Sequence, residues 1–536
     1  MDLKQEVQAW IADDPDPKTA AQLQQWLDSN NEVELRASFS GFLQFGTAGL
    51  RGPIRPGPSG MNRAVVGRTA AGIAAYMKER NLTSVVIGRD ARYGSEDFTF
   101  ETAQIMSGAG MKVYVLPRPL PTPVLAFATN ELKCDVGIMV TASHNPPQDN
   151  GYKVYLGGTV DGIHYRGSQI VSPTDESIAQ KIDLITSLTS QPRGKEWTVL
   201  GEEVVDKYVG ITAALANKPG NLKIVYTAMH GVGTETLQQV FHKAGFPQPI
   251  LVESQAKPDP DFPTVAFPNP EEPGAIDLAL ETARTFDADL VIANDPDADR
   301  CAAAVKDPVK GWRMLRGDEL GVILGETIAR ATTQGILANS IVSSSILSKI
   351  AAHYKLDFKE TLTGFKWLAK IDGLTFGYEE ALGYAVDATT VNDKDGISAA
   401  IKLAQIATDL AAQNKTLLDL LDEVWARHGF HATEQISIRL SDLSQVGVIM
   451  GNLRSNSPKE IAGRSVTSID DLAKPKDGLP PTDGLRIWLD GGIRIIIRPS
   501  GTEAKMKCYI EAIAKDSATA QAVLDQLRAP LKELLS

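Results

Sequence analysis

Short runs of β-branched and apolar residues alternate with helix-like stretches along most of this chain. The first cycle, residues 84–200, opens with SVVIGRD, passes through a helical pattern and returns to strands at KVYVLP and VGIMVTA. A second cycle starts near residue 205 and a third near residue 313, each of similar size and order. This alternation predicts three successive α/β domains with mixed sheets.

The C-terminal part of the chain has a different pattern. Its strand-like runs are QISIRL, GLRIWLD, GIRIIIRP and KMKCYIEAIA, close together in sequence and followed by an amphipathic helix at 516–535. This order predicts a smaller α+β domain with an antiparallel sheet. The length of 536 residues suits three or four domains. We expect them at 1–204, 205–312, 313–425 and 426–536.

Composition excludes several classes of partner. The balance of 66 acidic to 54 basic residues gives a formal charge of −12, which disfavours broad electrostatic binding to nucleic acid or to an anionic membrane. No apolar run approaches the roughly 18 residues that cross a bilayer. The start, MDLKQEVQAWIADDPDP, lacks the basic stretch and apolar core of a secretory signal. Cys134, Cys301 and Cys508 show no metal-ligand spacing, which favours reduced thiols and a cytoplasmic location.

Three carboxylates follow the apolar run LVIA in NDPDADR, residues 294–300. Asp295, Asp297 and Asp299 alternate along a loop at the carboxyl edge of a predicted strand, where they can converge on one hard cation. An EF-hand is disfavoured because Arg300 stands at its glycine position and Lys306 at its glutamate position. Turn formation or helix capping remains the alternative interpretation.

Ser143 lies in TASHNPPQDNGYKVY, residues 141–155, between a strand pattern and a Pro/Gly/Asn-rich loop. A serine hydroxyl is a poor nucleophile unless a cation and a base assist it, and NDPDADR and Lys153 are candidates for these roles. Near the C-terminus RPSGTEAK offers a guanidinium, hydroxyls and exposed backbone N–H groups that suit a phosphate, or else form a tight turn. HGVG at 230–233 fails the dinucleotide pattern, and no GxxxxGK[ST] occurs.

Three further segments are ambiguous by themselves. In GYEEALG, Glu379 and Glu380 could accept hydrogen bonds from sugar hydroxyls, or begin a solvated helix. TLTGFKW at 361–367 and NDKDG at 392–396 each place a lysine beside a glycine, as in an anion site or an exposed turn.

The set of motifs and its order resemble one family. FGTAGLRG, TASHNP, NDPDADR, TGFKW, GYEEALG and RPSGTE together resemble the signatures of the α-D-phosphohexomutase superfamily of phosphoglucomutases and phosphomannomutases, across nearly the whole chain. GYKVY, TAMHGVG and GYEEALGY look like the branch of bacterial phospho-sugar mutases, phosphopentomutases and glucose 1,6-bisphosphate synthases. The resemblance implies phosphoserine, metal-binding, sugar-binding and phosphate-binding domains, in that order, around one central cleft.

By this resemblance Ser143 carries a phosphoryl group that Mg²⁺ bridges to the three aspartates. The phosphoserine passes its phosphoryl group to a sugar monophosphate, and a sugar bisphosphate such as glucose 1,6-bisphosphate turns over and returns the other one. Lys153 is implied as the general base, with a pKa lowered by cationic neighbours. His144, Arg300 and Arg51 are implied around the phosphoryl group. The residues implied in substrate binding are Thr363, Gly364, Lys366, Glu379, Glu380 and Lys394. Those implied for the non-reacting phosphate are Arg498, Ser500, Gly501 and Thr502.

One departure affects the expected substrate. The family's sugar loop usually reads Glu-x-Ser, whereas Ala381 follows the glutamates here, so a hydroxyl for the sugar is missing. We expect interconversion of glucose 1-phosphate and glucose 6-phosphate. A phosphopentomutase or a glucose 1,6-bisphosphate synthase is the near alternative, and a non-catalytic sugar-phosphate sensor is the remote one. Phosphorylated sugars are the expected partners, with no nucleic acid or membrane, and the protein is expected to be a monomer or homodimer.

Overall fold

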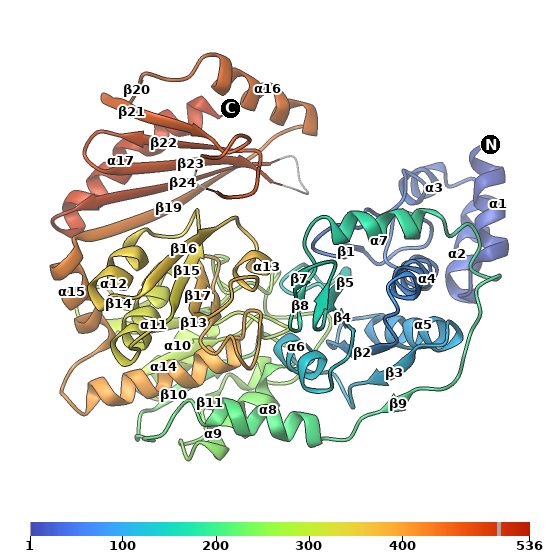
Figure 1. Ribbon diagram of the computed structural model, residues 1–536, viewed down its shortest axis with the longest axis horizontal. Helices are drawn as coiled ribbons and strands as arrows, with labels where there is room; N and C mark the ends of the chain where they lie inside the picture. Colours follow the sequence, from blue (N-terminus) through green and yellow to red (C-terminus); the bar gives the residue numbers. More distant parts are fainter. Residues whose placement is uncertain (1, 477, 501–504, 536) are drawn as a thin grey trace. The chain divides into compact units, whose positions relative to one another are not determined.

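The computed structural model describes residues 2–476, 478–500 and 505–535 (Figure 1). It divides into two compact units. Unit 1 comprises Met1–Leu315, Ala369–Asp372 and Gly383–Ala412, and unit 2 comprises Arg316–Leu368, Gly373–Leu382 and Gln413–Ser536. The chain therefore passes between the units several times, and the segment 313–425 that was predicted as one domain contributes to both.

Unit 1 begins with three short helices, α1 (Leu3–Asp13), α2 (Pro17–Asp28) and α3 (Glu32–Ser38). Each helix has a side-chain N-cap, from Asp2, Asp16 and Asn31 respectively, that accepts a hydrogen bond from a backbone N–H of the first turn. Val7, Leu23 and Leu35 form their small core.

The first large sheet of unit 1 has seven strands in the order β1-β5-β4-β2-β3-β9, with β8 paired to β5. The strands are β1 (Leu50–Pro53), β2 (Ser84–Arg89), β3 (Lys112–Val115), β4 (Val136–Val140), β5 (Asp149–Leu156), β8 (Ser168–Gln169) and β9 (Thr198–Val199). β2 pairs in parallel with β3 and β4, whereas β5 runs antiparallel to β1, β4 and β8, so the sheet is mixed. Every residue of the central strand β4 is buried, as expected for a strand covered on both faces.

The helices of this part of unit 1 are α4 (Arg63–Glu79), α5 (Ser95–Gly108), α6 (Thr122–Glu131) and α7 (Thr174–Asp183). Two short strands, β6 (Thr159–Val160) and β7 (Ile163–His164), form a small hairpin.

The second sheet of unit 1 has the order β11-β10-β12-β13-β14. Its strands are β10 (Ile224–Thr227), β11 (Ile250–Leu251), β12 (Leu290–Ala293), β13 (Ala302–Asp307) and β14 (Gly311–Met314). β10 is parallel to β11 and β12, and β12 is antiparallel to β13. The accompanying helices are α8 (Glu203–Ala213), α9 (Gly233–Lys243), η1 (Glu253–Gln255) and α10 (Asp277–Thr285). Two elements from later in the chain, β18 (Gly383–Ala385) and α14 (Gly396–Ala411), also belong to unit 1. Asp395 caps α14 by accepting from Ile397 N and Ser398 N, each at 3.0 Å.

Unit 2 contains a parallel α/β part and a C-terminal part. In the first, β15 (Ile336–Ser340) lies between β16 (Asp357–Thr361) and β17 (Leu374–Glu379). Its helices are α11 (Gly317–Ala331), α12 (Ile346–Tyr354), α13 (Phe365–Leu368) and α15 (Leu417–His428).

The C-terminal part is an antiparallel sheet in the order β19-β24-β23-β22-β21-β20 (Figure 1). The strands are β19 (Phe430–Arg439), β20 (Glu460–Ile461), β21 (Arg464–Asp471), β22 (Leu485–Leu489), β23 (Ile493–Pro499) and β24 (Lys505–Ala514). Leu524, Leu527 and Leu531 of α17 (Ser517–Leu534) share its core, and α16 (Leu443–Ser455) is the other helix of this part. Among the described residues, no helix combines the length and the apolar character needed to cross a membrane.

Candidate active site

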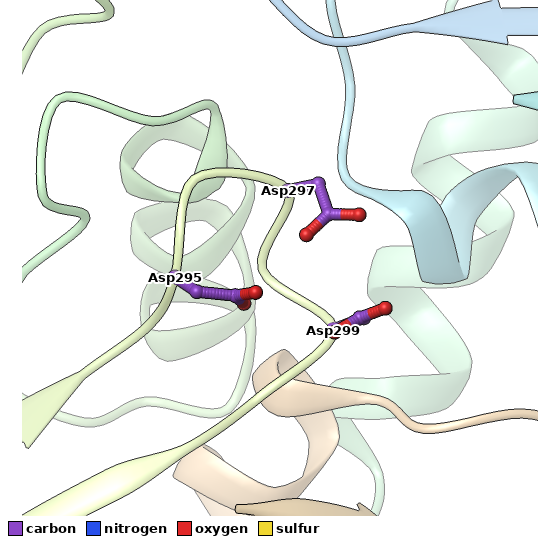
Figure 2. Close-up of side chains that lie close together, drawn as sticks. All are labelled: Asp295, Asp297 and Asp299. Carbon is purple, nitrogen blue, oxygen red and sulfur yellow. The ribbon is translucent and has the colours of Figure 1, made fainter. Parts of the chain in front are cut away.

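The loop between β12 and β13 brings Asp295, Asp297 and Asp299 together (Figure 2). One carboxylate oxygen from each lies within 4.8 Å of the others, and all three residues are at most 1 % exposed. The loop is held by backbone bonds from elsewhere in unit 1. Thr122 N donates to Asp297 O at 2.9 Å, and Val232 N donates to Pro296 O at 2.9 Å. The converging carboxylates are therefore fixed by the fold before any ligand arrives.

The unsatisfied oxygens of this cluster fit a divalent cation. Oδ1 of Asp297 and Oδ1 of Asp299 are buried and accept no hydrogen bond within the described residues, which is costly unless a ligand satisfies them. Burial, with the charges of Asp297 and Asp299, raises the pKa of Asp295 to about 8. A divalent cation would relieve that repulsion, and carboxylate oxygens are the ligands that Mg²⁺ prefers. The triad could therefore bind the predicted metal ion.

Ser143 lies directly against this cluster, in the loop that follows β4. Its Oγ donates to Asp295 Oδ2 at 2.8 Å and lies 3.3 Å from His144 Nδ1. Ser143 has a φ of 52° and is 3 % exposed. Its backbone N–H donates to Thr141 Oγ1 at 2.9 Å. The predicted nucleophile and the predicted metal ligand, 152 residues apart in sequence, thus share a hydrogen bond.

Two lysines pair with the aspartates. Lys153 Nζ on β5 lies 2.7 Å from Asp297 Oδ2 and 2.8 Å from Asp299 Oδ2, and Lys394 Nζ lies 3.2 Å from Asp299 Oδ2. Burial would lower the pKa of Lys153, but the carboxylates of Asp297 and Asp299 outweigh it and raise that pKa. The expectation that cationic neighbours lower the pKa of Lys153 is therefore wrong for this arrangement, because its nearest charges are negative.

The remaining cations of the site have unused donors. Nε of Arg51, on β1, and Nε of Arg300 are buried and donate no hydrogen bond within the described residues. Arg51 Nη1 donates to Asn145 Oδ1 at 3.3 Å, and Arg300 Nε lies 3.9 Å from Asp295 Oδ2. Burial, then the charges of Arg300 and Arg51, keeps the pKa of His144 well below its usual value, so its imidazole is neutral. Buried guanidinium groups with spare N–H donors suit a phosphoryl group.

Among the described residues predicted to bind sugar and phosphate, all except Lys394 belong to unit 2. Gly364 N, beside Thr363, donates to Glu379 Oε1 at 2.6 Å, and Lys366 follows in α13. Glu380 Oε2 instead accepts from Ser340 Oγ and Ser343 Oγ, each at 3.1 Å.

Tyr509 connects these glutamates with the C-terminal sheet. Burial, then Glu380, raises the pKa of Tyr509, while Arg498 acts on the same phenol in the opposite direction. Arg498 and the glutamates therefore share one neighbourhood in unit 2. Ser500 N donates to Lys505 O at 2.8 Å. Gly501 and Thr502 lie outside the described residues.

Sequence models of one family match four successive segments of the chain. Phosphoglucomutase/phosphomannomutase alpha/beta/alpha domain I matches residues 43–187, domain II 204–311, domain III 316–428, and the C-terminal domain 451–529. The chain belongs to the phosphoglucomutase/phosphomannomutase family. This assignment confirms the predicted superfamily and the predicted class of three α/β domains plus a C-terminal domain. It also makes the protein an isomerase of the phosphohexomutase type.

Individual relatives of this mutase carry different names. A probable phosphomannomutase from Haemophilus influenzae is 49 % identical over 482 residues, covering 89 % of this chain and 98 % of the relative. A phosphopentomutase from Mus musculus is 34 % identical over 574 residues, covering 96 % and 90 %. The crystal structure of a putative phosphomannomutase from Thermus thermophilus has a TM-score of 0.70, with 22 % identity over 92 % of this chain and 99 % of that one. That last similarity concerns the fold alone.

Sequence reasoning missed two polar side chains that support the site of this mutase. Thr122, at the start of α6, donates from Oγ1 to Asp297 Oδ2 at 2.6 Å. Asp393 anchors the segment that carries Lys394, since its Oδ2 accepts from Tyr155 OH at 3.0 Å and from Gln169 Nε2 at 2.9 Å. The proline-rich run PRPLPTP, residues 117–123, which contains Thr122, was the only local signal for the first residue. The second residue, Asp393, lies within NDKDG, where only Lys394 was predicted to have a role.

Proposed function

We propose that this protein moves a phosphoryl group between the 1-oxygen and the 6-oxygen of glucose through a phosphoserine at Ser143. The observation that carries the proposal is the hydrogen bond from Ser143 Oγ to Asp295, inside a buried triad of carboxylates. The spare Nε donors of Arg51 and Arg300 support it, because a phosphoryl group on Ser143 needs cationic donors around it.

Each transfer on this serine balances in the same way. The bond from Ser143 Oγ to phosphorus breaks, the bond from the sugar oxygen to phosphorus forms, and the proton lost by the sugar hydroxyl is balanced by the proton that Ser143 Oγ regains. The bisphosphate then returns its other phosphoryl group to Ser143. A Mg²⁺ ion held by the three aspartates would supply charge neutralisation during transfer. We propose Lys153 as the general base that takes the proton of the sugar hydroxyl. Because Asp297 and Asp299 raise the pKa of Lys153, this role requires a cation at the aspartates that offsets their charge.

We assign supporting roles to the other predicted residues. Arg51, Arg300 and neutral His144 hold oxygens of the transferring phosphoryl group, and Lys394 balances the charge at Asp299. In unit 2 Glu379 accepts from sugar hydroxyls, with Thr363, Gly364, Lys366 and Glu380 completing that set. Arg498, Ser500, Gly501 and Thr502 bind the phosphate that does not react. The four predicted domains, 1–204, 205–312, 313–425 and 426–536, remain our proposal for the division of these roles.

A pentose phosphate is the second candidate substrate. Ala381 removes a sugar-binding hydroxyl, and a phosphopentomutase is among the relatives, so ribose 1-phosphate must be compared directly. The family description names phosphoglucomutase and phosphomannomutase together, so glucose and mannose 1-phosphates are compared with ribose 1-phosphate. The test is kcat/KM on glucose, mannose and ribose 1-phosphates with Mg²⁺ and glucose 1,6-bisphosphate. A strong pentose preference would replace glucose, and net accumulation of glucose 1,6-bisphosphate would indicate a synthase.

The serine itself is tested by substitution. Ser143→Ala is expected to abolish turnover, and intact-mass analysis of the wild type after incubation with glucose 1,6-bisphosphate should show one added phosphoryl group that the variant lacks. Ser177→Ala is the control, since that serine on α7 bonds Pro173 O at the surface. Mutase activity at the wild-type rate in Ser143→Ala would remove Ser143 from the mechanism.

A further inference from the structure

Arg92 follows β2 and is buried, with 4 % of its surface exposed. Its guanidinium donates to backbone carbonyl oxygens of a single segment, residues 143–149, which comprises the loop after β4 that carries Ser143 and the first residue of β5. The four acceptors are Ser143 O at 2.7 Å, Asn145 O at 2.6 Å, Pro146 O at 2.8 Å and Asp149 O at 3.1 Å. Nη2 donates to the first pair and Nη1 to the second. One side chain therefore holds most of this loop.

The rest of the Arg92 side chain also faces protein. Nε lies 3.4 Å from Asp90 Oδ2, and the guanidinium carbon lies 4.8 Å from the centre of the Phe262 ring. Asp90 is itself fixed, because its Oδ1 accepts from Ser95 Oγ at 2.6 Å and from Arg92 N at 3.0 Å. A guanidinium has five N–H donors. Four are directed at the serine loop, and the fifth, Nε–H, is buried beside Asp90 without a hydrogen-bond partner among the described residues.

The loop needs such support because its own backbone provides little. Residues 141–148 lie outside strands and helices, and Ser143 has a positive φ of 52°, a conformation that costs a non-glycine residue free energy. Asn145 N to Ala142 O and Asp149 N to Pro146 O are the short-range backbone bonds within it, at 3.0 and 3.1 Å. The position of Ser143 Oγ relative to Asp295 therefore depends on contacts from outside the loop.

We propose that Arg92 is a positioning residue for phosphoryl transfer, which holds the serine loop so that Ser143 Oγ faces the aspartate cluster. This inference rests on the proposed function for its catalytic consequence. Arg92 acts through the loop backbone and touches no reacting atom. Lysine cannot replace it, because a single ammonium nitrogen cannot span four separate carbonyl oxygens as the planar guanidinium does.

The test compares Arg92→Lys with the wild type in steady state. A misplaced nucleophile is expected to lower kcat by about 10²-fold, while KM for the sugar phosphate stays close to wild type. Hydrogen exchange of peptides covering residues 141–155 is expected to accelerate in the variant, with the other strands of the sheet unchanged. Arg89→Lys is the matched control. Arg89 ends the same strand but pairs with the exposed Glu96 at 2.9 Å. Neither kcat nor the hydrogen exchange of residues 141–155 should therefore change in Arg89→Lys.

Wild-type kcat in Arg92→Lys, or a loss that appears only in KM, would overturn the proposal. If the wild type turns over no sugar phosphate, the proposed function fails, and the exchange measurement alone then decides whether Arg92 holds the loop. If Arg92→Lys does not fold, Asp90→Asn replaces it, because the amide keeps the shape of Asp90 but removes its charge. Asp90→Asn is expected to lower kcat and to accelerate hydrogen exchange of residues 141–155, both by less than Arg92→Lys would. If kcat and the exchange rate are both unchanged, the proposal is again contradicted.

Discussion

At the scale of single residues, the aspartate cluster keeps buried carboxylate oxygens that its protein partners do not satisfy. Burial would raise the pKa of Asp299, and Lys153 with Lys394 lowers it below its ordinary value, so this carboxylate is ionised. Its Oδ1 is nevertheless buried without a hydrogen-bond partner among the described residues. An ionised carboxylate with an unsatisfied oxygen, in a group of three, is the arrangement that a divalent cation stabilises.

The first prediction concerns Asp299→Asn. Losing a ligand is expected to weaken Mg²⁺ binding by more than the roughly 10–100-fold that follows loss of an outer hydrogen-bond partner. The measurement is thermal unfolding against Mg²⁺ concentration, since a ligand that binds the folded state raises Tm. Asp287→Asn is the control, because Asp287 is an exposed partner of Lys306. Its Tm should rise with Mg²⁺ as the wild-type Tm does. An equal Mg²⁺-dependent rise in Tm for Asp299→Asn would argue against the site.

The second prediction concerns Thr122→Val. This change keeps the side-chain shape but removes the hydroxyl that donates to Asp297 Oδ2, so Asp297 is oriented less firmly. Mg²⁺ affinity is expected to fall about 10-fold, by the same Tm titration. Thr129→Val is a close control, because Thr129 is buried on the same helix and its hydroxyl donates to Leu125 O, away from the aspartates. If both variants lose the same affinity, the effect is one of packing and not of ligand orientation.

At the scale of elements, the sequence predicted what local patterns encode. LVIA followed by NDPDADR shows a buried strand that ends in alternating carboxylates, and the ends of strands are where side chains converge. Neither Arg92 nor Thr122 could be found in this way, since their partners lie 51 to 57 and 175 residues away along the sequence. The pKa of Lys153 was misjudged for a similar reason. The sequence shows that cations gather near the site but not that two carboxylates lie nearest to that lysine.

The HGVG segment, which failed as a dinucleotide motif, has a packing role at this scale. A Cβ on Gly231 would lie 2.3 Å from the Cα of Pro296, in the backbone of the aspartate loop. We predict that Gly231→Ala displaces that loop, lowers stability by about 1–3 kcal/mol and weakens Mg²⁺ binding. Gly210→Ala is the control, because nothing lies within 4 Å of its added Cβ inside α8. That variant should gain roughly 0.5–1 kcal/mol and keep its affinity. Denaturant unfolding measures the stability of each variant, and the Mg²⁺ titration measures its affinity. An unchanged Mg²⁺ affinity in Gly231→Ala would contradict the close-contact argument.

At the scale of the whole molecule, the two units separate the predicted chemistry into two sets. The nucleophile, the carboxylates and the lysines belong to unit 1, whereas Glu379 and Arg498 belong to unit 2. NDKDG was predicted alongside the unit 2 residues, yet it folds with unit 1, where Asp395 accepts from Tyr208 OH at 2.9 Å. Sequence order alone could not show this, because the chain returns to unit 1 after β17.

Unit 2 has its own buried charge network. Glu511 Oε1 on β24 accepts from Ser345 N at 2.8 Å, and its Oε2 lies 3.0 Å from Arg494 Nη2. His431 Nδ1 lies 3.0 Å from Oε1 of the same carboxylate. Burial would raise the pKa of Glu511, but Arg494 and His431 outweigh it and lower that pKa to about 2. The network therefore joins the C-terminal sheet to the loop that follows β15, with an ionised glutamate at its centre.

A pH dependence of stability follows from this network. A carboxylate with a folded-state pKa of about 2, against an unfolded value of 4.5, stabilises the fold above pH 4.5 and loses that contribution as pH falls towards 2. Between pH 6 and pH 3 the loss is about 2 kcal/mol. The difference in unfolding free energy between wild type and Glu511→Gln should therefore shrink by this amount, read from hydrogen exchange in β23 and β24. Glu460→Gln, at an exposed position of β20, controls for removal of a surface carboxylate. A difference for Glu511→Gln that is the same at both pH values would mean that Arg494 does not hold this glutamate ionised, and that the network stabilises unit 2 by packing instead of by charge.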